Sequence, residues 1–376
     1  MNHDAFAARI AALRACLGNM GRVGRNPVDA FLVVCQDGLG WEDVYYLTGF
    51  VGSASALLVT SDSAELFLDA RYPETAEAGL GGIVSCVATG RRSPLQAAID
   101  ALAEVHPTRL AYGGRRMGYG AYRHLERAIG SAVGLVDMSN LLSNLRRRKS
   151  REETDCIREA VRIASAAFRQ TLPLIHAGMS ERDLACELAY RLQRLGSDFV
   201  DPVPVMVSCG KRTALPHAVP GNERLAVGDL VMIDFGARAA GYVCDITRML
   251  SVGEPSQEVR TLHGLLLWAQ AEAASLLAPG RAVQEVDAAA RGVLESAHLG
   301  GWMIHALGHG IGLNIHETPS ISAAPGCPLA TGDVVTLEPG IYRNGWGGLR
   351  IEDDYLVTAN GACCLSSDLS RELCVV

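Results

Sequence analysis

Two aspartates stand within apolar, strand-like sequence in the stretch VMIDFGARAAGYVCDITRML, residues 231 to 250. Asp234 follows three apolar residues, and Asp245 stands between a cysteine and an isoleucine. The intervening GARAAG is bounded by glycines and suits a hairpin turn, so both carboxylates can share one face of two neighbouring strands. Two such buried carboxylates repel each other unless a cation lies between them. A structural aspartate pair near a turn has the same pattern, so the pair alone leaves both interpretations open.

Further candidate ligands follow near the end of the chain. The stretch HALGHGIGLNIHE is rich in glycine and histidine, LEPGIY places a glutamate at the end of an apolar strand, and GGLRIEDDYLV places another inside one. The side chains concerned are His305, His309, His316, Glu338 and Glu352. Each alone could be a satisfied polar group or a surface charge. Four carboxylates and an imidazole at the ends of apolar strands together predict a metal site.

The types of donor atom limit which metal ions the predicted site would bind. Four oxygen donors to one nitrogen favour a hard or borderline divalent ion such as Mn²⁺ over a closed structural zinc site. Two ions accommodate so many carboxylates more easily than one does.

The same residues carry a family resemblance. The phrases IDFG, CDITR, GHGIGLNIHE, LEPGIY and GWGGLRIEDD resemble the pita-bread metallopeptidases, and within them the Xaa-Pro dipeptidases and Xaa-Pro aminopeptidases. The five ligand positions match in identity and order. The segment YYLTGFVGSASALLVTSDSAELFLDARY resembles the creatinase-like N-terminal domain of these enzymes. The resemblance therefore covers nearly the whole chain.

The resemblance implies a ligand scheme for two divalent ions, with Mn²⁺ favoured and Co²⁺ or Zn²⁺ as alternatives. Asp245 and Glu352 would bridge the ions. Asp234 would complete the shell of one ion, and His309 with Glu338 that of the other. Two ions so held lower the pKa of a shared water enough to supply hydroxide near neutral pH.

The resemblance also implies residues that face the substrate. Its catalytic residues would be His217 (in TALPHA), His316 and Glu338, with His316 contacting the scissile carbonyl and Glu338 moving a proton to the leaving nitrogen. The substrate pocket would be formed by His217, His305, His316, Tyr342 and Arg350. The family's usual HGTGHG is HALGHG here, which predicts an altered wall at Ala306 and Leu307.

The activity implied is that of a metallopeptidase that cleaves small peptides before proline. An alternative is a C–N hydrolase of the same fold that acts on a small non-peptide substrate, as creatinase- or ectoine-hydrolase-like enzymes do, because a fold does not determine a substrate. A non-catalytic binding module predicts lost ligands, and none is lost. The family also implies a homodimer.

The elements that must position these residues divide into two predicted domains, 1–148 and 149–376. The first alternates strands (29–36, 55–62, 64–70) with helices (the N-terminus, 91–106) and predicts an α/β fold of the creatinase-like type. The charge run RRRKSREET (146–154) predicts a solvated linker that leads into a helix, with Ser150 as N-cap and Glu153 at the third helical position.

The second predicted domain contains helices in pairs followed by strands, twice over. Helices are expected at 152–175, 180–196, 256–278 and 283–298, and strands at 203–208, 229–235, 242–250, 332–340 and 350–357. This order predicts an α+β pita-bread domain with a duplicated helix-and-antiparallel-sheet unit, arranged around one sheet.

Composition limits the class of protein. The chain has 376 residues, 49% hydrophobic and 20% charged, with a net charge of -7, which gives no electrostatic reason to expect nucleic acid or an anionic membrane as partner. It contains neither a secretory signal pattern nor an apolar run long enough to span a membrane. Eleven cysteines without a C-x-x-C pair predict reduced core thiols in a cytoplasmic protein.

Overall fold

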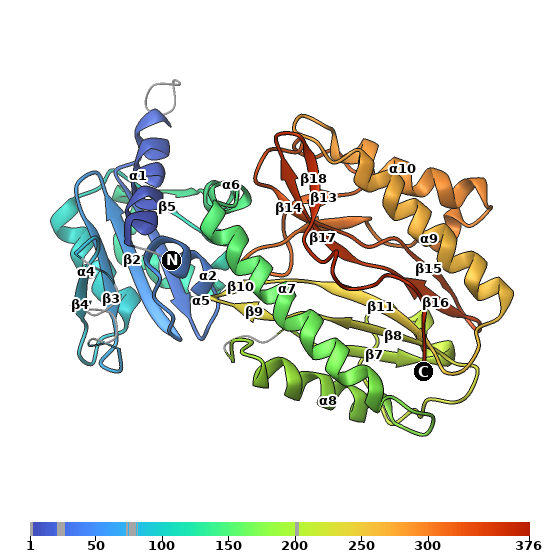
Figure 1. Ribbon diagram of the computed structural model, residues 1–376. Coiled ribbons are helices and arrows are strands. Elements are labelled where there is room, and N and C mark those ends of the chain that lie inside the picture. The colour runs from blue at the N-terminus through green and yellow to red at the C-terminus, as the bar shows by residue number, and fades with distance from the viewer. Residues whose placement is uncertain (1–2, 21–26, 73, 75–79, 81, 200–202) are drawn as a thin grey trace. The chain divides into compact units, whose positions relative to one another are not determined.

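The computed structural model describes residues 3–20, 27–72, 74, 80, 82–199 and 203–376 (Figure 1). The chain forms two compact units, Met1–Arg146 and Arg147–Val376. Within the described ranges, no helix combines the length and the apolar character that crossing a membrane requires.

The first unit is built on a six-stranded mixed sheet with strand order β4-β3-β2-β1-β5-β6. Its strands are β1 (Ala30–Gln36), β2 (Ala54–Thr60), β3 (Ala64–Leu68), β4 (Ser85–Ala88), β5 (Arg109–Tyr112) and β6 (Gly134–Asp137). Its helices are α1 (His3–Met20), α2 (Trp41–Thr48), α4 (Pro94–Val105), α5 (Tyr119–Ile129) and α6 (Ser139–Arg147). Leucines of α4 and α5 pack against one face of β1 and β2. The predicted α/β organisation is confirmed.

The charge run between the units forms the predicted helix start. Ser150 Oγ accepts a hydrogen bond from Glu153 N, and Glu153 Oε2 accepts one from Ser150 N, which makes a capping box at the start of α7 (Arg151–Thr171). The prediction that the run is solvated is correct only in part, because Arg148, Arg151 and Glu152 are exposed but other basic residues are not. Arg147 is buried and pairs with Asp333, and Lys149 is buried and pairs with Glu317. Each basic group meets a carboxylate from a distant part of the chain.

The first half of the second unit packs two helices on a sheet. Helices α7 and α8 (Glu181–Arg194) cover a four-stranded sheet of order β19-β11-β8-β7 (Figure 1). The strands are β7 (Met206–Cys209), β8 (Leu230–Phe235), β11 (Ile246–Ser251) and β19 (Cys374–Val375), with a small hairpin, β9 (Arg238–Ala239) and β10 (Tyr242–Val243), between β8 and β11. Helix α7 ends before the predicted residue 175 because Pro173 lies in the 3-10 turn Leu172–Leu174.

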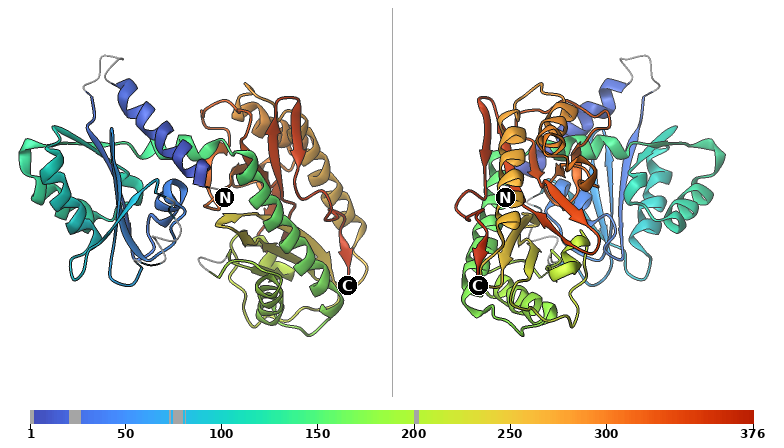
Figure 2. Two further views of the ribbon diagram at one scale, coloured as in Figure 1. Left: turned by 60° about the vertical axis from the view of Figure 1, so that its left-hand side comes forward. Right: turned by 90° about the vertical axis from the view of Figure 1, so that its right-hand side faces the viewer.

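The second half repeats this plan. Helices α9 (Gln257–Ser275) and α10 (Val283–Ser296) lie side by side against strands of a five-stranded sheet of order β13-β12-β14-β17-β18 (Figure 2). Its strands are β12 (Gly308–Gly310), β13 (Glu317–Ile321), β14 (Val334–Leu337), β17 (Asp353–Thr358) and β18 (Gly361–Cys364), and β15 (Gly340–Arg343) pairs with β16 (Gly347–Arg350). The predicted duplication is confirmed.

The expectation of one sheet needs correction. The two halves have separate sheets, which meet at an isolated bridge between Thr247 and Glu352. The strands therefore change partners at the residues that the sequence marks as ligands.

The cysteines also differ in part from the prediction. All eleven are free, as expected, but only three are buried and several are exposed. The buried thiols are Cys35, Cys209 and Cys244, and the exposed ones are Cys186, Cys327 and Cys363.

Candidate metal centre

The two aspartates lie on one long hairpin. Strands β8 and β11 pair with Asp234 opposite Thr247, and the ladder is interrupted at Gly236 and Asp245 before β9 and β10. A Cβ at Gly236 would lie 2.0 Å from Cys244 O, so only glycine permits this approach. The turn itself is Ala240–Gly241, with φ of 47° and 83°, and is shorter than the predicted GARAAG. The two carboxyl groups are close enough to interact, because the charge of Asp234 contributes to raising the pKa of Asp245.

The two glutamates lie on a second long hairpin. The register that pairs Leu337 with Asp353 in β14 and β17 continues in β15 and β16, so Glu338 and Glu352 lie opposite each other between the two strand pairs. The predicted strands 332–340 and 350–357 are therefore each interrupted at a glutamate. Pro339, which has no N–H to donate, follows Glu338.

His309 lies on β12 between these carboxylates. Its Nε2 atom is 3.6 Å from Glu338 Oε1 and 3.9 Å from Asp245 Oδ2. Donor atoms of Asp245, His309 and Glu352 all lie within 4.8 Å of one another. Because His309 Nδ1 lies 3.1 Å from Gly310 O, which can only accept, Nδ1 carries the proton and Nε2 is free to bind a cation.

The carboxylates of this cluster have too little positive charge around them to balance their own, as the pKa shifts show. Burial, and then the neighbouring carboxylates, raise the pKa of Asp245 well above its usual range. Burial and the Asp234 charge raise the pKa of Glu352 to about 7. Burial and the nearby His316 lower the pKa of His309 to about 4, so its imidazole is neutral at pH 7. Three buried carboxylates and the half-buried Glu338, together with a neutral imidazole, fit divalent cations.

Arg350 organises the wall behind this group. Its Nη2 atom pairs with Asp234 Oδ2, its Nε donates to Thr247 Oγ1 at 3.0 Å, and its Nη1 donates to Tyr342 Oη at 3.1 Å. Thr247 Oγ1 in turn donates to Glu352 Oε2 at 2.7 Å. One guanidinium does not balance four carboxylates, but it fixes the orientation of two of them.

A cleft of about 470 Å³ opens onto the centre. Its lining contains most of the side chains predicted to face the substrate, with apolar groups between them: Pro216, His217, Ile304, His305, Ala306, Gly308, His309, His316, Ser320, Glu338 and Arg350. Tyr342 is not among them. It is 6% exposed and lies behind the wall, where its hydroxyl is 2.9 Å from His305 Nε2.

The departure HALGHG alters the cleft at a single position. Ala306 lines the cleft, whereas Leu307 has 0% exposure and packs in the core with the helices α9 and α10. The prediction that both residues change the wall is correct for Ala306 and wrong for Leu307.

Several supporting residues were not singled out from the sequence. Thr247 orients Glu352, and Asp354 Oδ2 accepts a hydrogen bond from Asp245 N at 3.1 Å. On α10, Asp287 accepts from Leu307 N and pairs with Arg291, whose Nη2 donates to His305 O. Thr247 shares a strand face with Asp245, so alternation could have indicated it. The only sequence pattern that could have indicated the contacts of Asp287 is its i, i+4 spacing from Arg291 on a predicted helix.

The approach of β12 to β14 depends on Gly308. A Cβ there would lie 2.0 Å from Thr336 O, yet this approach lets His309 N donate to Thr336 Oγ1. We expect Gly308→Ala to lower the free energy of unfolding by about 1–3 kcal/mol, the usual effect of overpacking, and to weaken metal binding by displacing His309. Urea unfolding and metal titration measure both.

Gly301→Ala is the matched control, because a Cβ there has no atom within 4 Å. Equal stability and metal affinity in the two variants would contradict the assigned role of Gly308.

Comparison with known proteins agrees with this geometry. The family profile described as Metallopeptidase family M24 matches residues 155–359, and the Creatinase/Prolidase N-terminal domain matches residues 9–148. An uncharacterized peptidase of Bacillus subtilis, YqhT, is 35% identical over 94% of this chain and 96% of its own length. An Xaa-Pro dipeptidase of Pyrococcus horikoshii is 31% identical over 93% of this chain and 95% of its own length.

Solved structures are similar over the same extent. An Xaa-Pro dipeptidase from Bacillus anthracis covers 99% of this chain and 100% of its own, with a TM-score of 0.89 and 31% identity. An X-Pro aminopeptidase from Thermotoga maritima covers 93% of this chain and 98% of its own, with a TM-score of 0.86 and 31% identity. The resemblance stated from the motifs is confirmed: the chain belongs to metallopeptidase family M24 and carries a creatinase/prolidase N-terminal domain.

Proposed function

We propose that this protein is an Xaa-Pro peptidase that hydrolyses the bond before proline with the help of two divalent ions. The observation that carries the proposal is the cluster of Asp245, His309 and Glu352, whose donor atoms lie within 4.8 Å of one another. Glu338 lies 3.6 Å from His309, and both line a cleft that also contains exposed imidazoles. Similar proteins named Xaa-Pro dipeptidase and X-Pro aminopeptidase support it.

The proposed ligands are those implied by the motifs. Asp245 and Glu352 would be shared between two ions, Asp234 would serve one, and His309 with Glu338 the other. The predominance of carboxylate oxygen favours Mn²⁺, with Co²⁺ or Zn²⁺ as alternatives. When bound, such ions act as Lewis acids and lower the pKa of water, which supplies a nucleophile near neutral pH.

Two histidines in the cleft wall are proposed to act on the substrate. His217 and His316 are exposed and line the same cleft. Partial loss of hydration in the cleft wall lowers the pKa of the His316 imidazole, so its neutral form offers an N–H to the scissile carbonyl oxygen. Glu338 faces the cleft, where its carboxylate can accept a proton and pass it to the leaving nitrogen.

The remaining proposed substrate contacts come from the polar wall and the apolar patches. His305 and Arg350 line the cleft directly, and Tyr342 acts through its hydrogen bonds to both. Pro216, Ile304 and Ala306 supply apolar surface beside them. An Xaa-Pro bond has no N–H, so recognition must depend on the carbonyl group and the proline ring, which this mixed lining suits.

We expect Xaa-Pro dipeptides to be cleaved about 10- to 200-fold faster, in kcat/KM, than Xaa-Ala dipeptides, the range in which an apolar pocket discriminates. Steady-state kinetics with Mn²⁺-loaded enzyme on both series provide the measurement, with longer Xaa-Pro peptides to distinguish a dipeptidase from an aminopeptidase.

Creatine-like amides belong in the same panel, and chelated enzyme is the blank. Equal rates for the two dipeptide series, or cleavage of the amides alone, would transfer the assignment to a C–N hydrolase with a non-peptide substrate.

Three further proposals accompany the activity. We propose a boundary between the domains at residues 148 and 149, a homodimer and a cytoplasmic location. The free thiols support a reducing compartment. Limited proteolysis, light scattering and cell fractionation test them in turn.

A further inference from the structure

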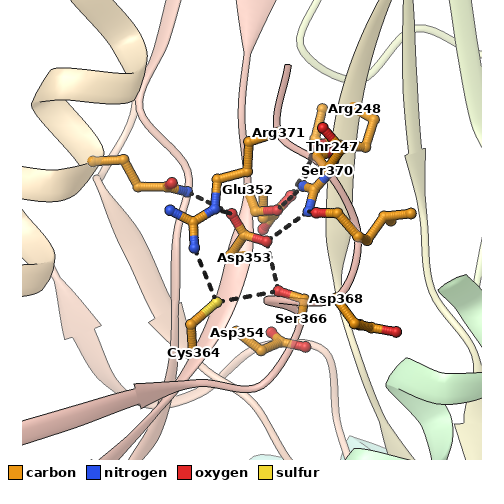
Figure 3. A network of polar contacts seen from close by, with 12 residues as sticks. Thr247, Arg248, Glu352, Asp353, Asp354, Cys364, Ser366, Asp368, Ser370 and Arg371 are labelled. Carbon is orange, nitrogen blue, oxygen red and sulfur yellow. Dashed lines mark hydrogen bonds and ion pairs between the residues drawn. The ribbon is translucent and has the colours of Figure 1, made fainter. Parts of the chain in front are cut away.

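A buried carboxylate lies directly beside the proposed metal ligands. Asp353 follows Glu352 and has 0% exposure. Its Oδ1 atom accepts from Arg248 Nη2 at 2.7 Å and Ser366 Oγ at 2.5 Å (Figure 3). Its Oδ2 atom lies 3.0 Å from Arg371 Nε and accepts from Gln270 Nε2 at 3.1 Å.

Arg248 connects this carboxylate to two ligand-bearing segments. Its Nη1 atom donates to Thr247 O at 2.9 Å and to Glu352 O at 2.7 Å. Its other N–H groups reach Asp353 and, at the C-terminal segment, Leu369 O and Ser370 O. All five N–H groups of the guanidinium thus have an acceptor, a geometry that an ammonium group cannot reproduce.

Gln270 connects the same carboxylate to a third ligand-bearing segment. It extends from α9, is completely buried, and donates through Nε2 both to Asp353 Oδ2 and to Leu337 O at 3.0 Å. Leu337 immediately precedes Glu338. Through Arg248 and Gln270, Asp353 therefore links the backbone at β11, at the end of β14 and at Glu352.

Asp245, Glu338 and Glu352 are carried by these three segments, and each adjoins the end of a different strand: β11, β14 and β17, respectively. Their carboxylates repel one another without a cation, so the strands need fixed attachments to hold them at a common spacing. Groups that support metal ligands in this way commonly change metal affinity when they are replaced.

We propose that Arg248 and Gln270 are positioning residues which, through Asp353, fix the spacing of Asp245, Glu338 and Glu352 and so set the affinity of the centre for divalent ions. The proposal rests on the metal centre proposed above. It assigns the guanidinium a role beyond pairing with a buried charge, since Arg371 pairs with the same carboxylate from a more exposed position.

The two arginines provide a matched test. Arg248→Lys keeps a positive charge near Asp353 but loses the donors to Thr247 O and Glu352 O. Arg371→Lys makes the same chemical change at a side chain whose contacts, among the described residues, are an ion pair with Asp353 and a hydrogen bond to Cys364 Sγ. Calorimetric titration of the metal-free proteins with Mn²⁺, and visible spectra of the Co²⁺ forms, measure affinity and ligand geometry without reference to activity.

We expect Arg248→Lys to weaken Mn²⁺ binding by about 10- to 100-fold and to alter the Co²⁺ spectrum, and Arg371→Lys to leave both unchanged. Equal effects of the two substitutions, or none from either, overturn the proposal. If Arg248→Lys does not fold, Gln270→Met provides the test instead. It keeps the side-chain volume and removes the hydrogen bond to Leu337 O. Unchanged affinity in folded Gln270→Met overturns the proposal. Failure of the unaltered protein to bind Mn²⁺ would instead refute the metal centre itself.

Discussion

Exchange of Asp245 for asparagine should remove bound metal and reduce kcat/KM for Xaa-Pro cleavage by at least about 10³-fold, because the several kcal/mol of charge stabilisation that metal ions supply are lost. Asp245 is 8% exposed, and its carboxylate lies within reach of His309 and Glu352. Asparagine has nearly the same shape and removes one negative charge from a ligand that two ions would share. Metal analysis and steady-state kinetics on the purified variant provide the measurement.

The control is Asp155→Asn, which removes the same charge from the exposed surface of α7. Chelation of the unaltered enzyme should reproduce the loss, and Mn²⁺ should restore activity to that enzyme but not to Asp245→Asn. A variant that hydrolyses substrate normally after exhaustive chelation contradicts the dinuclear scheme.

Local patterns in the sequence were sufficient for much of the framework. The aspartate hairpin could be predicted from two apolar strands separated by glycines, and the start of α7 from a serine with a glutamate three residues later. Assigning each ligand to an ion required more than local pattern. Only the family motifs gave Asp234, Asp245 and His309 distinct roles, and those roles stay predictions.

Long-range pairing accounts for the errors. Arg147 and Lys149 looked solvated because their partners, Asp333 and Glu317, lie 186 and 168 residues away. Burial of such groups depends on a contact that no local window contains. The basic run alone could not show it.

The predictions of continuous strands through Glu338 and Glu352 were wrong for a related reason. Apolar periodicity continues through Glu338 and Glu352, yet the chain leaves one sheet and joins another at these residues. Periodicity reports which face is buried, not which strand is the partner. Tyr342, which the motifs place in the substrate pocket, is buried with its hydroxyl 2.9 Å from His305 Nε2, and its role in the pocket stays a prediction.

Replacement of His316 by alanine should lower kcat by about 10²–10³-fold, the effect of removing a single oxyanion donor, while two metal ions stay bound. The rings of His309 and His316 lie 4.2 Å apart, so the two residues are close enough to be confused. Their surroundings differ. His309 Nε2 lies within 4 Å of Asp245 and Glu338, whereas His316 is exposed in the cleft, where the neighbouring titratable groups that influence its pKa are His217 and Asp234.

An oxyanion donor interacts most strongly in the transition state, so its loss should appear in kcat more than in KM. His309→Ala instead removes the imidazole nitrogen from the donor set, so we expect that variant to lose metal from one site, with activity that recovers in part at high Mn²⁺ concentration. Metal analysis beside kinetics on both variants separates the two roles. Metal loss in His316→Ala with full occupancy in His309→Ala would show that the roles are exchanged, and would require the ligand set to be rebuilt around His316.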